Sequence, residues 1–248
     1  MRKLFLLLIV PAFFACEEKD LTTENPAKNK DNVNIETSIL YDTSTVHLDT
    51  IYTNNLGLEF YFTEMSFAFS DYTFAEKGDT ILHQPEPFLI TAKNQERLIS
   101  RFITGGYSGQ YGLRLGLDST QGVGYTKAMA QDDELKNSSV FRLDADGIDH
   151  IVIKGKLFDP LDPLDSIGKI PFDIRIGTTA YSRSKISDVN NFSVSGTAVI
   201  PFIVQINLWP VFNDMQLYDR PVIKTDPTNQ FDMDAALEVA DSLQVNLF

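Results

Sequence analysis

Residues 58–74 read LEFYFTEMSFAFSDYTF, and this stretch decides the fold class. Its aromatic residues Phe60, Phe62, Phe67, Phe69 and Phe74 keep mostly to one parity, the spacing at which side chains share one face of a β-strand. Turn-forming residues precede it at 54–57, which read NNLG. We therefore predict a long aromatic strand that is entered through a turn.

Shorter segments on both sides of this stretch have the same strand character. They lie at 39–41, 46–52, 88–91, 98–103, 109–117, 148–157, 172–177, 192–199 and 202–209, and Gly or Pro stands at nearly every boundary. A helix is predicted over 232–243, where Asp232 can act as the cap, and a shorter helical turn over 126–135. Many short strands with one peripheral helix predict an all-β fold: an antiparallel β-sandwich with a short C-terminal helix, formed by residues 33–248.

The N-terminus has the layout of a bacterial export signal. Arg2 and Lys3 precede an apolar run over 4–14, and Ala15 supplies the small residue before Cys16. The run is shorter than the roughly 20 residues that a membrane-spanning helix needs. We interpret residues 1–15 as a lipoprotein signal peptide rather than a transmembrane anchor.

The single cysteine lies directly after this signal. Cys16 is the only cysteine among 248 residues, so it cannot form an intramolecular disulfide. Its position next to Ala15 favours lipidation, and several acyl chains anchor a protein stably to a membrane. Residues 17–32 are polar and contain no aromatic residue, which is typical of a flexible tether. Residues 16–32 are therefore predicted to be a lipidated cysteine and its tether.

The charge balance limits the partners. The formal net charge is −13, and without residues 1–15 the remaining 19 Lys and Arg against 34 Asp and Glu give −15. Such a chain is repelled by nucleic acid and by anionic headgroups. We expect no nucleic-acid partner.

Histidines and acidic clusters are the candidates for metal binding. His47, His83 and His150 show no pair four residues apart; His47 and His150 lie in predicted strands and are either converging metal ligands or ordinary strand residues. Two acidic runs either bind a hard cation weakly or are solvated loops; their carboxylates are Asp144, Asp146 and Asp149, and Asp159, Asp162 and Asp165. We assign no metal ligand and no cofactor.

Catalytic motifs are not evident. Ser108 and Ser195 lack the glycines of a nucleophile elbow, and residues 122–124 (GVG) lack the third glycine of a dinucleotide site. Aromatic residues either form a sugar-stacking platform or belong to the core; they are Phe62, Phe67, Tyr72, Tyr107 and Tyr111. We predict a binding module rather than an enzyme, with an accessory glycan-binding lipoprotein as the alternative.

Several short motifs together resemble the MbnP-like family of exported proteins, named for a copper-binding, methanobactin-associated member. The first is the run 49–57 together with residues 60–69. Similar segments are Gly106-Tyr107, 112–118, 147–155, 172–177, 206–212 and 235–248. The resemblance covers most of residues 33–248 and implies a β-sandwich in an exported protein.

The departures from the family pattern concern its copper site. The tryptophan-rich segment of the family corresponds to residues 140–144, which contain no Trp, and its "H-l-G" element corresponds to Arg175-Ile176-Gly177. The only tryptophan, Trp209, lies in another segment. The resemblance therefore implies the fold, the exported location and a link to metal handling, but the copper site does not follow, because its Trp and His residues are missing. The ligand stays open among a metal ion, a glycan and a protein.

Acidic residues directly after Cys16 resemble the surface-export signals of Bacteroidota lipoproteins. They are Glu17, Glu18 and Asp20, with Lys19 among them. This implies an outer-membrane lipoprotein displayed at the cell surface, with the periplasmic face as the alternative.

Overall fold

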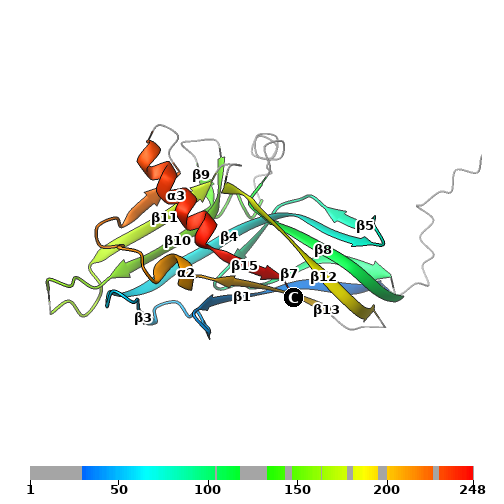
Figure 1. The fold of residues 1–248 in the computed structure, drawn as a ribbon, viewed down its shortest axis with the longest axis horizontal. Helices are drawn as coiled ribbons and strands as arrows, with labels where there is room; N and C mark the ends of the chain where they lie inside the picture. Colours follow the sequence, from blue (N-terminus) through cyan, green and yellow to red (C-terminus); the bar gives the residue numbers. More distant parts are fainter. Residues whose placement is uncertain are drawn as a thin grey trace, which may run out of the picture.

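A computed structural model describes residues 30–103, 105–117, 133–142, 147–162, 164–177, 181–194, 200–225 and 229–247 (Figure 1). Within these ranges the chain forms two β-sheets. In the smaller sheet the strand order is β15 (Gln244–Leu247), β13 (Ile200–Asn207), β1 (Lys30–Tyr41) and β2 (Ser44–Thr45), and β7 (Glu96–Ile103) also pairs with β1. In the larger sheet the strand order is β12 (Arg183–Val194), β8 (Gly105–Leu115), β4 (Glu59–Glu76), β10 (Gly147–Leu157), β11 (Ile170–Gly177) and β14 (Val222–Lys224). Four short strands complete the larger sheet: β3 (Ile51–Thr53), β5 (Asp79–Gln84) and β6 (Phe88–Thr91) on β4, and β9 (Phe141–Arg142) on β10.

The two sheets enclose an aromatic core, which confirms the predicted β-sandwich. Phe202 of β13 lies 4.6 Å from Tyr111 and 6.1 Å from Tyr72, ring centre to ring centre, so residues of both sheets meet directly. All strand pairs of the described residues are antiparallel except β1 with β13 and β11 with β14. The sequence did not predict these two parallel pairs, because parallel partners are joined through long connections that leave no local signal.

Strand β4 keeps its aromatic residues in the core by changing register twice. Against β10 the pairing shifts at Thr63, and against β8 it shifts near Asp71, whose φ is +52°. Each β-bulge adds one residue, so inward positions change from even numbers to odd and back to even. Phe62, Phe67 and Phe74 are therefore all fully buried although they do not share one parity. The expectation of one dominant parity is wrong for this reason.

The helices lie at one side of the sandwich (Figure 1). Helix α3 (Gln230–Ser242) confirms the predicted C-terminal helix but begins earlier: Asn229 precedes it, and Asp232 lies in its first turn rather than at the cap. Helix α2 (Trp209–Phe212) comes directly after β13, where the sequence predicts the end of a strand. No helix in the described ranges has the length and apolar character needed to cross a membrane.

Other sequence-based boundaries differ from the structure. The strand predicted over 46–52 is a loop from 46 to 50, and β3 comes after it; the short strands β5, β14 and β15 are not predicted. The helical turn predicted over 126–135 lies mostly outside the described residues, as do residues 195–199 of another predicted strand.

The start of β1 and the loop between β10 and β11 lie at opposite ends of the long axis (Figure 1). The described chain begins at Lys30, at the start of β1, whereas the loop between β10 and β11 (residues 158–169) lies at the opposite end (Figure 1). Pairing of Leu157 with Phe60 places this loop beside the start of β4.

Candidate functional site

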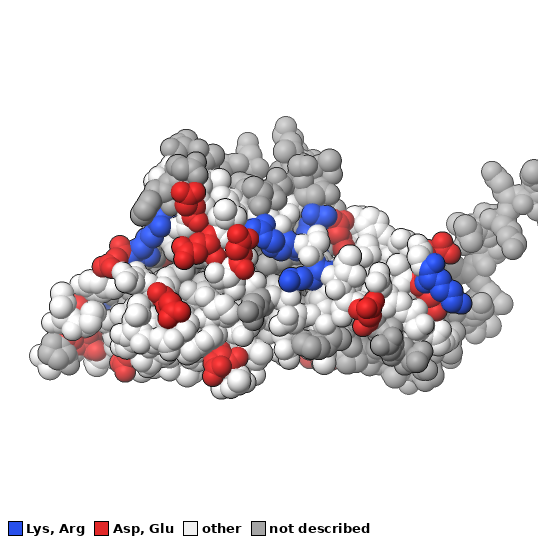
Figure 2. Space-filling view, in the orientation of Figure 1, with Lys and Arg blue, Asp and Glu red and all other residues white. Residues whose placement is uncertain are grey.

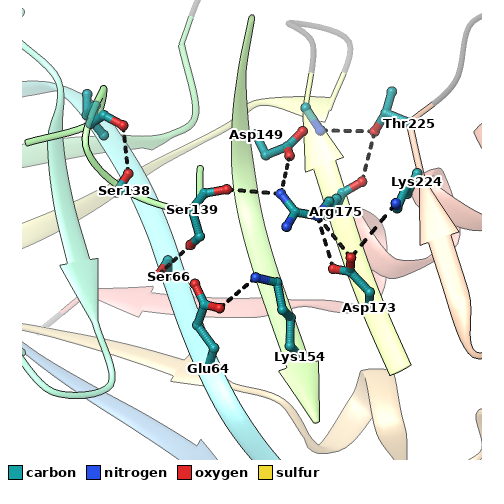
Figure 3. Close-up of polar contacts among 12 residues, drawn as sticks. Glu64, Ser66, Ser138, Ser139, Asp149, Lys154, Asp173, Arg175, Lys224 and Thr225 are labelled. Atoms are coloured by element: carbon teal, nitrogen blue, oxygen red, sulfur yellow. Dashed lines mark hydrogen bonds and ion pairs between the residues drawn. The ribbon is translucent and has the colours of Figure 1, made fainter. Parts of the chain in front are cut away.

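The outer face of the larger sheet carries a network of charged side chains (Figure 3). Lys154 and Arg175 alternate with the buried Ile153 and Ile174, so they point away from the core. Glu64 of β4 and Asp173 of β11 extend the network across three neighbouring strands. The alternation of strand residues therefore gathers these charges on one surface.

Arg175 is the centre of the network. Its Nε donates to both carboxylate oxygens of Asp173 at 3.1 Å, and its Nη1 donates to the Ser139 carbonyl at 3.0 Å and to Asp149 Oδ2 at 3.4 Å. Asp149 has no solvent exposure. Burial by itself lowers the pKa of Arg175, but the carboxylates of Asp173 and Asp149 outweigh this effect and raise it. Arg175 is therefore a permanently charged group fixed by its neighbours.

The remaining charges of the network are also paired. Lys154 Nζ donates to Glu64 at 2.7 Å, and Lys224 Nζ lies 3.9 Å from Asp173. Desolvation raises the pKa of Glu64, but hydrogen bonds from Lys154 and Ser139 outweigh it, so the pKa falls. Three bases thus balance three carboxylates within this network, and the arrangement joins β4, β10, β11 and β14.

A surface pocket of about 380 Å³ lies beside this network. Glu64, Ser66 and Ser139 line one side of it, and Lys93 and Met65 also contribute. A small apolar cluster next to it packs the segment 133–142 onto the sheet; its members are Ala68, Leu117, Leu135, Val140, Ile148 and Val152.

The three histidines do not form a common site. His47 is exposed, and its backbone N–H and C=O both bond to the Tyr52 hydroxyl. His150 is buried, and its Nε2 accepts a hydrogen bond from the Leu117 N–H at 3.2 Å. His83 lies 3.3 Å from Asp71.

The separation of His47 and His150 results from β4. The N–H of Asp49, near His47, bonds to the Phe62 carbonyl, whereas the N–H of Gly116, beside His150, bonds to the Ala68 carbonyl. Six strand residues span roughly 20 Å. Convergence of these two histidines is therefore wrong, and the described part of the chain contains no group of three or more His, Cys, Asp or Glu side chains placed to hold a metal ion.

The second acidic run is a folded loop rather than a cation cage. Asp159 Oδ1 accepts the N–H of Leu161, and Asp162 accepts both the N–H of Leu164 and the Nζ of Lys169. Desolvation raises the pKa of Asp165, but backbone N–H groups that include that of Asp159 outweigh it and lower the pKa. In the first run, Asp149 belongs to the Arg175 network, and Asp144 and Asp146 lie outside the described residues.

The aromatic residues proposed as a sugar platform belong to the core instead. Phe62, Phe67, Tyr72 and Tyr111 are fully buried, and Tyr107 is partly buried against Phe74. The platform interpretation is wrong, because the bulges of β4 and the pairing of β8 turn these side chains inward. Ser195 and residues 122–124 lie outside the described residues.

A groove next to α3 was not evident from the sequence. It has a volume of about 390 Å³ and lies between α2, the segment 214–220, β14 and α3. Val211, Met215 and Ile223 supply apolar lining, and Asp219 and Glu238 supply acidic groups. Its walls come from four separate segments, so no single motif could have revealed it.

Comparison with known proteins supports the fold. No family model and no curated protein matches the chain. Among solved structures, MbnP from Methylosinus trichosporium superposes with a TM-score of 0.50 at 10% sequence identity, covering 80% of this chain and 82% of that one. The chain thus has a distant MbnP-like fold at very low sequence identity.

Proposed function

We propose that this chain is an exported, lipid-anchored binding module of the bacterial cell envelope that has no copper site at the position where the MbnP-like pattern places one. The observation that carries this proposal is the environment of Arg175, which stands where that pattern has a histidine. The proposed role is binding rather than catalysis.

The residues around Arg175 do not fit copper. A neutral imidazole offers a lone pair to a metal, whereas a guanidinium offers only donors and carries a permanent positive charge. The carboxylates of Asp149 and Asp173 are already paired with Arg175. The hydrogen bond from Arg175 to the Ser139 carbonyl places this guanidinium beside residues 140–142, where the family pattern has tryptophan. A copper ion at this position would be repelled by the Arg175 guanidinium, and the carboxylates of Asp149 and Asp173 already pair with that guanidinium.

The groove beside α3 supports a binding role. Ligand sites commonly have volumes of about 300–1,000 Å³ and combine apolar walls with a few polar groups. The groove beside α3, at about 390 Å³, has that size and composition. It is the candidate site for a small ligand.

The anchor is proposed from the N-terminal sequence. Positive residues, an apolar run and Ala15 precede the single cysteine, Cys16. The polar residues 17–29 separate Cys16 from β1, which begins at Lys30, three residues earlier than the predicted start of the domain. The test is metabolic labelling of the full chain with an alkyne fatty acid, and then cell fractionation. We expect label and membrane association in the wild type and the loss of both in Cys16→Ser. Equal labelling of the two proteins would contradict the anchor.

A further inference from the structure

The loop between β10 and β11 presents large apolar side chains to solvent. Leu161 and Leu164 are 79% and 86% exposed, the highest values among large apolar residues of the described chain, and Ile167 on the same loop is 64% exposed. A single exposed leucine is ordinary, but three large apolar side chains exposed on one short loop are not, and apolar patches on a surface mark interaction sites. We define Leu161, Leu164 and Ile167 as the apolar tip.

The tip is held in place by its own aspartates. Asp159, Asp162 and Asp165 each accept, through Oδ1, a hydrogen bond from the backbone N–H two residues later, at 2.9, 3.0 and 3.3 Å. Those N–H groups belong to the three tip residues. The Tyr61 hydroxyl also donates to the Ile167 carbonyl at 2.9 Å and ties the loop to β4. The apolar side chains are therefore presented by an ordered backbone, which lowers the entropy cost of binding.

The position of the tip favours a protein over a bilayer. The tip lies at the end of the molecule opposite Lys30, and Cys16 precedes Lys30 by only 14 residues. The 18 residues of β4 alone span roughly 60 Å between these ends. A domain held through Cys16 keeps Lys30 near the membrane that holds the lipid, and the tip can reach roughly 60 Å beyond it. This step rests on the proposed lipid anchor.

Charge favours one kind of protein partner. Three aspartates and Lys169 leave residues 158–169 with a formal charge of −2, and the whole chain is strongly acidic. In Figure 2 this end, at the left, is mostly uncharged with acidic patches beside it. An anionic surface repels such a loop, whereas a basic rim around an apolar pocket attracts it. We propose that the apolar tip docks into an apolar pocket with a basic rim on another protein of the envelope.

The test is photo-crosslinking of the full chain in the cells that make it. A benzophenone amino acid replaces Leu164 in one protein and Ile186 in the control; Ile186 is 71% exposed but belongs to no apolar group among the described side chains of β12. We expect one discrete adduct at position 164, at least about tenfold stronger than at 186, because the tip carries three exposed large apolar residues on one loop. Mass spectrometry should place the crosslink in an apolar segment of the partner that is flanked by Lys or Arg.

Variants of the two other tip residues show whether the apolar surface causes the adduct. Leu161→Asp combined with Ile167→Asp should abolish it, and Leu161→Met should retain it. Both side chains point into solvent, so the denaturation midpoint of the double variant should match the wild type, and loss of the adduct then reports lost docking.

Four results would overturn the proposal: adducts to lipid only, adducts to a second copy of the chain only, a partner segment that is acidic or polar, or no adduct above the Ile186 level. The fatty-acid label tests the lipid anchor separately from the docking of the apolar tip. A wild-type chain that carries no fatty-acid label would contradict the anchor, whereas a labelled chain without the adduct contradicts only the tip.

Discussion

Replacing Arg175 with methionine tests whether the charged network stabilises the sandwich. The substitution keeps much of the apolar stem and removes the guanidinium that pairs with Asp149, a carboxylate with no solvent exposure. Removing one partner of a buried ion pair typically costs about 3–5 kcal/mol. The Arg175–Asp149 distance is 3.4 Å and 22% of the Arg175 side chain remains exposed, so we expect the lower end, about 3 kcal/mol.

The assay is urea-induced unfolding monitored by the fluorescence of Trp209, the only tryptophan, and by circular dichroism. Lys224→Met is the matched control: its Nζ lies 3.9 Å from Asp173 and its side chain is 48% exposed, so we expect a change within about 0.5 kcal/mol. Combining Arg175→Met with Asp149→Leu removes both charges of the pair and should recover stability to within about 1 kcal/mol of the wild type.

Two results would refute the structural role of Arg175. One is a cost below about 1 kcal/mol for Arg175→Met, which would mean that the pair is no stronger than an ordinary surface ion pair. The other is a double variant no more stable than the single one, which would mean that the buried carboxylate of Asp149 is not the source of the loss.

Three further experiments, with five substitutions, test the packing around the network and in the core, each measured by urea unfolding. Burial lowers the pKa of His150 from 6.5 to about 4. Between these pH values the unfolded chain binds a proton at His150 and the folded chain does not, so the folded state loses stability as the pH falls. Between pH 7 and pH 4 the wild type should lose about 3 kcal/mol more than His150→Gln, and equal losses would contradict this. Gly116→Ala places a Cβ 2.3 Å from His150 Nδ1 at a φ of +95° and should cost about 2–4 kcal/mol. The control Gly57→Ala has a φ of +77° but open space around its Cβ, so it should cost about 1–2 kcal/mol. Equal losses in the two variants would contradict the steric contact with His150. The buried Tyr72 hydroxyl has no hydrogen-bond partner in the described part of the chain, so Tyr72→Phe should stabilise the protein by about 1 kcal/mol. Tyr111→Phe removes a 3.3 Å hydrogen bond to the Ile203 carbonyl and should destabilise it by about 1 kcal/mol. The reverse order of stabilities would contradict this account.

The sequence predicted the fold where the signal is local. Alternating apolar residues identified most strands, including all of β6, and helical spacing identified α3. The two parallel pairs and the short strand β14 depend on contacts between distant segments and could not be read from periodicity. Strand β5, in contrast, pairs with the end of β4 across the tight turn at Lys77 and Gly78, and this local hairpin was missed. The parity of β4 misled because a bulge cannot be seen without the partner strand.

The candidate site shows the same limit. The sequence already showed that Arg175 stands where the MbnP-like pattern has a histidine, but the pairing of Arg175 with Asp149, 26 residues earlier, was not visible. His150 and Asp149 are adjacent in the chain yet lie in different environments, since one meets Gly116 and Leu117 and the other meets Arg175. Composition placed the aromatic residues in the core or on a platform, and only strand register decided between the two.

The most direct test of the central claim is the copper content of the detergent-solubilised full chain after incubation with copper and desalting, measured by inductively coupled plasma mass spectrometry. A parallel sample of Arg175→His replaces the guanidinium with an imidazole where the MbnP-like pattern has a histidine. The account predicts that the wild type retains no copper above a protein-free blank, because the paired guanidinium of Arg175 fills the position that a metal ligand would need. Near-stoichiometric copper in the wild type would contradict it.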